Sequence, residues 1–326
     1  MPTPSNLDGV LVQWGDRLFY PANRVVRART PKLAGAGIQV RAHAIRQRIH
    51  ATVVRRASQV MVKVTGGGRG MAAIAAHLRY ISKGGRLPIE DDRGLKREGK
   101  EALRDLVDQW RLGGSRIPEI SERREAFNIM LSMPAGTKAE IVQSAAREFA
   151  KADLANHRYV MVLHTHQANP HVHLSVRAEG RDGQRLNPRK EDLRRWRETF
   201  AQRLRGWGIE AEASSQVTRG MRHRDERVWE RKTTIPREQR PARAEPLPSG
   251  IRSQALKAWV EIMRALAASP EVSDRQLAQS IHRYVGRMPA VQAIVRHESK
   301  QRELPGMGRP PLTIPPQQRR GPEIER

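Results

Sequence analysis

The sequence contains no cysteine in its 326 residues. Disulfide bonds, cysteine-ligated zinc and thiol nucleophiles are therefore excluded. Aromatic residues make up only 4% of the chain, so a folded core must be built mainly from aliphatic side chains. No apolar run approaches the roughly 20 residues that a membrane-spanning helix needs. The N-terminus lacks a basic start followed by an apolar stretch, and we expect neither a secretory signal nor membrane insertion.

Acidic residues are also scarce. The chain has 34 Asp and Glu against 60 Lys and Arg, which gives a net charge of +26. An excess of this size favours a polyanionic partner, and nucleic acid leads because neutralising phosphates releases counterions. An anionic membrane surface is the rival partner, but the sequence shows no long basic amphipathic helix with an aromatic and aliphatic face.

Composition divides the chain into a central domain with extensions at both ends. Proline and arginine accumulate from 234 to 250, which is the clearest boundary. The predicted parts are a basic N-terminal extension (1–57), a central domain (58–233) with an insertion at about 86–120, a Pro/Arg-rich linker (234–250), a helical segment (251–299) and a disordered tail (300–326). We interpret the N-terminal extension as an arm that lies on an acidic partner.

Hydrophobic periodicity predicts mixed strands and helices in the central domain. The predicted strands are 59–65, 126–133, 158–163 and 172–177, and the predicted helices are 71–82, 100–112, 138–151 and 188–207. The last two strands are joined by a short loop and should form an antiparallel hairpin. The pattern predicts an α+β fold with a central antiparallel sheet flanked by helices, plus two C-terminal helices at 253–268 and 273–285.

Glycines at 66–70 are expected to form a loop after the first strand. The run lacks the Gly-Lys-Ser/Thr ending of a phosphate-binding P-loop, which disfavours nucleotide binding.

Histidines are concentrated in the predicted hairpin. Four of the 11 histidines fall within ten residues, at positions 164, 166, 171 and 173. Side chains alternate across a strand, so His171 and His173 share a face, as do His164 and His166 if their strand runs straight. A lone buried histidine is usually an ordinary core residue, but four on adjacent strands would be costly to bury without a shared partner. The pattern predicts a metal site with at least three nitrogen ligands.

These residues resemble the metal motif of the HUH endonucleases, in which a His-hydrophobic-His pair follows Asn-Pro and a third histidine lies on the preceding strand. Segments 67–85, 128–137 and 185–190 are similar, in the same order, to the other motifs of the mobilization relaxases of conjugative plasmids and integrative elements. The similarity spans about residues 60–220.

The resemblance implies that His164, His171 and His173 are metal ligands and that Tyr80 is the single catalytic tyrosine. One departure concerns His166, which stands where relaxases of this kind usually carry an acidic residue. It is interpreted as a fourth ligand, a group behind the ligands or a proton acceptor. Without the resemblance, Tyr80 would be read as ordinary packing at a helix end.

Other polar residues carry less specific predictions. The resemblance implies that Ser132 contacts the DNA backbone. An ordinary serine at the end of a strand is an equally good interpretation. Glu125 is expected either to orient a ligand histidine from behind or simply to be solvated at a strand end. The basic residues expected to contact DNA are Arg69, Arg189, Lys190 and Arg194.

The resemblance implies a DNA relaxase that nicks one strand at an origin of transfer by metal-assisted transesterification. The enzyme would form a 5′-phosphotyrosyl intermediate and later religate it, in plasmid mobilization and conjugation. The family suggests Mg or Mn as the divalent ion, and imidazole ligands would also take Zn or Ni. The implied partners are single-stranded origin DNA, relaxosome accessory proteins and a type IV secretion coupling protein. The implied location is the bacterial cytoplasm, with translocation alongside the DNA.

Two other functions fit part of the sequence. A metal-dependent nuclease that uses water would need the histidines but would leave Tyr80 without a role. A non-enzymatic basic DNA-binding accessory protein would explain the charge, with structural histidines.

Overall fold

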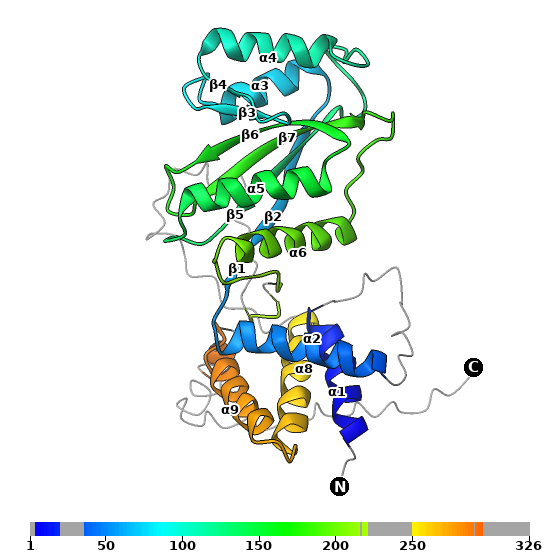
Figure 1. Cartoon of the computed structure of the whole chain (residues 1–326), viewed down its shortest axis with the longest axis vertical. Coiled ribbons are helices and arrows are strands. Elements are labelled where there is room, and N and C mark those ends of the chain that lie inside the picture. Colours follow the sequence, from blue (N-terminus) through cyan, green and yellow to red (C-terminus); the bar gives the residue numbers. More distant parts are fainter. Residues whose placement is uncertain (1–3, 20–35, 216, 221–249, 290, 296–326) are drawn as a thin grey trace, which may run out of the picture.

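The computed structural model describes residues 4–19, 36–215, 217–220, 250–289 and 291–295 (Figure 1). The helices are α1 (Pro4–Phe19), α2 (Ala36–Val53), α3 (Met71–Ile81), α4 (Lys100–Leu112), α5 (Ala139–Asp153), α6 (Lys190–Gly206), α8 (Gly250–Ala267) and α9 (Val272–Gly286). The strands are β1 (Ser58–Gln59), β2 (Met61–Gly68), β3 (Ile89–Asp91), β4 (Lys96–Arg97), β5 (Ala126–Ser132), β6 (His157–His164), β7 (His171–Gly180) and β8 (Ala211–Glu212). In these ranges no helix is long and apolar enough to cross a membrane.

Six strands form one antiparallel sheet in the order β2-β5-β7-β6-β3-β4. The predicted hairpin is its centre, because β6 and β7 pair directly and bring His164 opposite His171. A separate two-stranded parallel pair joins β1 to β8. The predicted α+β fold with a central antiparallel sheet and flanking helices is confirmed.

Helices cover both faces of the sheet (Figure 1). On one face, α5 and α6 form a core with the strands, and Trp196, Phe200 and Leu204 of α6 are buried because they recur every fourth residue. On the other face lie α3 and α4, which pack on Val160 and Val162. Side chains alternate along β6, so residues 160, 162 and 164 all face α3.

The glycines after the first predicted strand do not all form the predicted loop, so that prediction is wrong. Gly66, Gly67 and Gly68 continue β2 and pair with β5 across an irregularity between Val64 and Gly66. The absence of side chains explains this placement, since a Cβ at Gly67 would collide with the carbonyl oxygen of Ala126. The loop before α3 therefore shrinks to residues 69–70.

The expected insertion at 86–120 contains more than its predicted helix. The helix matches α4 as predicted, with Leu103, Leu106 and Trp110 buried. The segment also contributes β3 and β4 to the edge of the main sheet, with Asp91 paired to Val160. Such short strands carry little periodicity, which is why the sequence does not reveal them.

The described parts of the N-terminal extension form helices α1 and α2, which pack on other helices and do not form a separate arm. Apolar residues of α1 and α2 share a core with α8 and α9, in which Ile45, Trp259 and Ile281 are fully buried. We call these four helices the terminal helical unit. Thr218, which follows β8, contacts this unit: its hydroxyl donates to the carbonyl of Leu18 at 2.6 Å, and its carbonyl accepts from the Trp259 indole at 2.8 Å. Most of the predicted linker (234–250) and the predicted tail (300–326) lie outside the described residues.

Candidate active site

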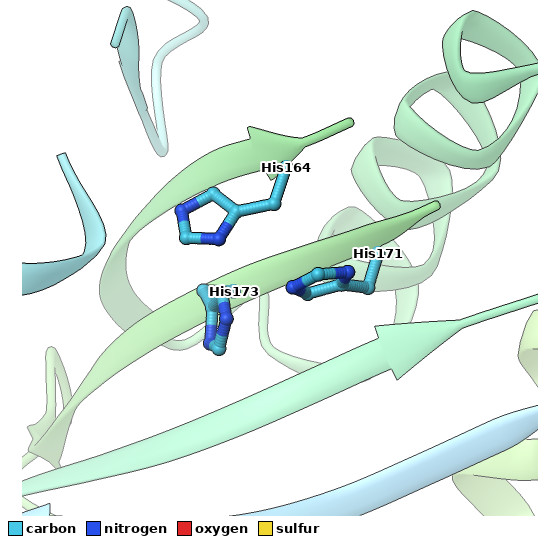
Figure 2. A group of neighbouring side chains, drawn as sticks. All are labelled: His164, His171 and His173. Atoms are coloured by element: carbon cyan, nitrogen blue, oxygen red, sulfur yellow. The ribbon is translucent and has the colours of Figure 1, made fainter. Parts of the chain in front are cut away.

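Three imidazoles converge at the end of the β6–β7 hairpin (Figure 2). One ligand atom each from His164, His171 and His173 lies within 4.8 Å of the others. Strand register produces this arrangement, because His164 is paired with His171 across the strands and His173 lies two residues further along the same face of β7. The ring centroids are 4.6 to 5.1 Å apart. The three ligands implied by the resemblance therefore lie together on the α3 face of the sheet.

Backbone carbonyls orient two of these rings. The Nε2 atom of His164 lies 2.6 Å from the carbonyl oxygen of Ile81, and Nδ1 of His171 lies 2.9 Å from that of Asn169. A carbonyl oxygen only accepts, so each of these nitrogens carries the proton and donates. The other nitrogen of each ring keeps a lone pair that can bind a metal.

The third ring lacks such a partner. Among the described residues, Nδ1 of His173 is buried and has no hydrogen-bond partner. Burial, with smaller contributions from His164 and His171, lowers the pKa of His173 to about 3. Burial also lowers the pKa of His164, helped by the charges of His171, His166 and Lys83. The imidazoles of His164 and His173 are therefore neutral near pH 7, which is the form that coordinates metals, and the three-nitrogen donor set fits a divalent cation.

His166 lies beside the triad on the solvent side. Its ring centroid is 5.0 Å from that of His164 and 6.2 Å from that of His171, and the residue is exposed. It is not a member of the three-residue group whose ligand atoms converge. This exposed position counts against a fourth ligand, and the roles of a group behind the ligands or of a proton acceptor stay predictions.

Tyr80 lies at the end of the helix that contacts the triad. It is 73% exposed, and the next residue, Ile81, provides the carbonyl that holds His164. The same helix carries His77, which the sequence analysis missed and which the i, i+3 spacing to Tyr80 could have suggested. The His77 and Tyr80 ring centroids are 6.4 Å apart.

His77 is half-buried, and one of its ring nitrogens, Nε2, is buried without a partner among the described residues. Burial lowers the pKa of His77. It is close enough to the triad for its charge to lower the pKa of His173, after the larger contribution of burial. His77 is therefore near both the exposed Tyr80 and His173 of the histidine triad.

Glu125 does not lie near the triad. Its carboxylate accepts from Ser121 and Arg123 at 2.9 Å and from Arg185 at 3.2 Å. Burial works to raise the pKa of Glu125, but these hydrogen bonds together lower it. Glu125 precedes β5 at the opposite end from the residue paired with His173, roughly 17 Å away along the strand. The predicted role behind a ligand histidine is therefore wrong.

Ser132 lies next to the triad, since it pairs with His171 in the sheet. It is buried, and its hydroxyl donates to the carbonyl of Pro170 at 3.3 Å. The present geometry shows a bond that fastens β5 to the hairpin loop. A contact between this hydroxyl and DNA stays a prediction.

The basic residues predicted to contact DNA are spread around the domain. Arg69 is exposed at the start of α3, roughly 16 Å of helix away from Tyr80. Arg189, Lys190 and Arg194 are exposed on or beside α6, which covers the sheet face opposite the triad. The structure therefore does not bring the α6 residues together with the three histidines.

Comparison with known families agrees with this geometry. Residues 81–209 match the family model described as "Relaxase: MobA/VirD2-like, nuclease domain". The matched range contains all three histidines of the triad and begins one residue after Tyr80. No curated protein matches the chain.

Proposed function

Residues 81–209 are a MobA/VirD2-like relaxase nuclease domain, and from that premise we propose that Tyr80 is the nucleophile with which this DNA endonuclease and strand transferase opens and rejoins one strand at an origin of transfer. The observation that supports this most directly is the contact between His164 and the carbonyl of Ile81. It ties the helix end that carries Tyr80 to the metal-binding group.

The proposed step is a transesterification. The phenolic oxygen of Tyr80 attacks the scissile phosphorus, the bond from phosphorus to the 3′ oxygen breaks, and a phosphotyrosyl bond to the 5′ side forms. The proton leaves the phenol and ends on the departing 3′ oxygen, so no water or outside reactant is consumed. The product remains a phosphodiester, and attack by a 3′-hydroxyl on the phosphotyrosyl bond rejoins the strands.

The three histidines have the task of holding a metal. His164, His171 and His173 would hold a divalent cation, which would supply a Lewis acid to the scissile phosphate. The carbonyls of Ile81 and Asn169 keep two of the rings oriented before DNA arrives. We propose Mg or Mn as the ion in the cell, as the family resemblance implies, and three imidazoles would also bind Zn or Ni.

The exposure of Tyr80 suits a strand that must reach it from solvent. A free phenol has a pKa near 10, so a proton acceptor at the site would speed attack at neutral pH. His77 is the nearest candidate on the same helix, because burial keeps its imidazole neutral. His166 is the candidate at the mouth of the site.

The test uses single-stranded oligonucleotides from the origin of transfer, labelled at the 3′ end and incubated with protein and Mn²⁺. After denaturation in detergent, the label should migrate with the protein, and Tyr80→Phe should abolish this adduct. Tyr159→Phe is the matched control, because it removes a hydroxyl from a buried tyrosine in β6 and should keep the adduct. Cleaved DNA without an adduct would support the hydrolytic nuclease, and binding without any nick would support the accessory protein.

Single-stranded origin DNA is the partner that the nuclease domain implies. We propose relaxosome accessory proteins and a type IV secretion coupling protein as further partners, with nicking in the bacterial cytoplasm and transfer alongside the DNA. Deleting residues 300–326, which lie outside the described residues, tests the last step. Unchanged transfer frequency would count against a secretion signal in this tail.

A further inference from the structure

A basic cavity of about 480 Å³ lies in the terminal helical unit, away from the histidine triad. It lies where the end of α2 meets the end of α9. The two helices contact one another, and Figure 1 shows α9 below the left end of α2. The polar residues that matter for its chemistry are Thr52, Arg56, Arg219, Arg283, Tyr284 and Arg287.

The cavity gathers positive charge, which is offset only in part: against the larger effect of burial, Glu212 outside its lining raises the pKa of Arg219. Four of its lining residues are arginines, and no acidic residue lines it in the described part of the chain. Within that part, the side chains of Arg56 and Arg287 make no hydrogen bond or ion pair, and Arg283 makes only one to Ser280 at 3.4 Å. Guanidinium groups held together in this way repel one another, and an anion would remove that repulsion.

Two neutral partners hold the guanidinium of Arg219 in place. Its Nε donates to the Ser214 hydroxyl at 2.7 Å, and one Nη donates to the carbonyl of Ala57 at 2.8 Å. Burial lowers the pKa of Arg219, which shows that its charge is poorly solvated. A guanidinium that is oriented by neutral partners and partly dehydrated is suited to bind an oxyanion through its remaining N–H groups.

A buried hydroxyl in the same cavity also lacks a partner. Thr52 is only 1% exposed, and its Oγ1 has no hydrogen-bond partner among the described residues. Burial raises the pKa of Tyr284, so its phenol stays protonated and is available as a donor. Hydroxyl donors beside arginines are the usual second component of a phosphate site.

A simpler explanation is that the arginines complement the negative ends of two helices. That effect is limited to the last turn of a helix and would account for Arg283 and Arg287. It does not account for Arg219, which lies in no helix, or for the unpartnered hydroxyl of Thr52.

We propose that this cavity binds a phosphate group, and that in the working enzyme the phosphate belongs to the DNA backbone outside the nick site. The choice of DNA as the source rests on the proposed function and on the charge of +26. The terminal helical unit would then hold flanking DNA while the triad and Tyr80 act on the scissile phosphate.

The first test measures DNA affinity of the full-length Arg283→Ala/Arg287→Ala variant by fluorescence anisotropy across a range of salt. Binding of a long origin strand should weaken about tenfold at 0.15 M salt, and the slope of log K against log salt should become shallower by about 1 to 2. Arg264→Ala is the matched control, because this arginine is on α8 and its side chain is 69% exposed beside Glu261. It should bind like the wild type, and thermal unfolding should confirm that both variants fold.

The second test separates the role of the hydroxyl from that of charge. Thr52→Val keeps the size of the side chain and removes an unpartnered polar atom, so the fold should be at least as stable. Affinity for the long strand should still fall about threefold, with the salt slope unchanged. A variant that is as stable as the wild type and binds DNA equally well would contradict a role for Thr52.

A third arm distinguishes backbone phosphate from a free phosphate compound. Inorganic phosphate, compared with chloride at equal ionic strength, should raise the unfolding temperature of the wild type and not of the double variant. If phosphate protects but DNA affinity and salt slope do not change, the site takes a small phosphate compound and the DNA assignment is wrong. If phosphate does not raise the unfolding temperature and the double variant binds DNA like the wild type, the cavity is not a phosphate site.

Failure here is distinguishable from failure of the proposed function. A short oligonucleotide that spans only the nick site tests Tyr80 alone, and its covalent adduct should form equally well in the wild type and in Arg264→Ala. An adduct on this oligonucleotide together with unaltered long-strand binding in the double variant would overturn the phosphate site and leave the nuclease proposal standing.

Discussion

The Nε2 atom of His164 lies 2.6 Å from the carbonyl oxygen of Ile81, a residue 83 positions earlier in the chain. This bond joins the end of α3 to the end of β6 and brings the residue after Tyr80 against the metal-binding group. It also leaves Nδ1 of His164 as the nitrogen with a free lone pair. The same contact therefore positions the helix end that carries Tyr80 and leaves Nδ1 of His164 free to bind a metal.

Loss of one ligand should abolish tight metal binding. His173→Ala removes the imidazole whose Nδ1 is buried without a partner, and Mn²⁺ affinity should fall by at least roughly 100-fold in a calorimetric titration. In the wild type, Mn²⁺ at 100 times its Kd should stabilise the fold by about 2.7 kcal/mol. The exposed His282 on α9 offers a control, since His282→Ala should leave both quantities unchanged. Equal affinity in His173→Ala would remove this residue from the ligand set.

The metal-free protein should lose stability in mild acid. Burial lowers the pKa of His173 from its ordinary value of 6.5 to about 3. Between these two pH values the unfolded chain binds more protons at this residue than the folded chain does. The free energy of unfolding therefore rises with pH in this window, and the stability that this residue contributes is lost progressively as the pH falls below 6.5. Urea unfolding in the presence of EDTA at pH 7 and pH 5 measures the effect.

The matched variant for this pH effect is His173→Asn, which cannot titrate and should show a shallower pH dependence. His282→Asn should keep the wild-type dependence. Parallel curves for the wild type and His173→Asn would mean that burial of this imidazole does not govern the acid sensitivity.

His77 should influence the chemical step more than DNA binding. His77→Phe keeps an aromatic ring beside Tyr80 and removes the buried nitrogen that has no partner among the described residues. If His77 accepts the phenolic proton, the rate of adduct formation should fall roughly 10- to 100-fold. Oligonucleotide affinity should stay within twofold, and the rate should depend more steeply on pH in the variant. A rate equal to that of the wild type would assign the proton to another group.

The terminal helical unit should be sensitive to loss of its central aromatic residue. Trp259 is fully buried, contacts the rings of Phe19 and Tyr284, and donates to the carbonyl of Thr218. Trp259→Ala should cost about 3–5 kcal/mol of unfolding free energy, which denaturant titration can measure. The exposed Trp207 is the comparison, and Trp207→Ala should cost far less. Similar losses in the two variants would argue against a packed core around Trp259.

The sequence predicted those features that depend on local periodicity. The triad was predictable because His171 and His173 alternate on one strand and a short loop fixes the pairing with His164. Helix α4 matched because Leu103, Leu106 and Trp110 follow helical spacing. The glycine-rich end of β2 was missed because glycine signals a turn, and only the close approach of Ala126 explains why it lies in a strand.

Features that depend on distant residues were not predictable. Glu125 precedes a strand that reaches the triad, but the strand register places it at the far end. The sequence alone does not show that the fold buries the Nε2 atom of His77 without a partner among the described residues. The arginine cavity combines residues from 52 to 287, and nothing in the local sequence relates Arg56 to Arg283. The shared core of the first and last helices is hidden for the same reason.

That shared core also bears on the order in which the protein can fold during synthesis. Helices α1 and α2 emerge first, but their packing partners α8 and α9 are translated roughly 230 residues later. At ordinary ribosomal speeds this delay lasts about 10 to 50 s, long enough for the whole nuclease sheet to form in between. Until then the apolar faces of α1 and α2 have no permanent cover, so they are the surfaces that chaperones would meet on the nascent chain.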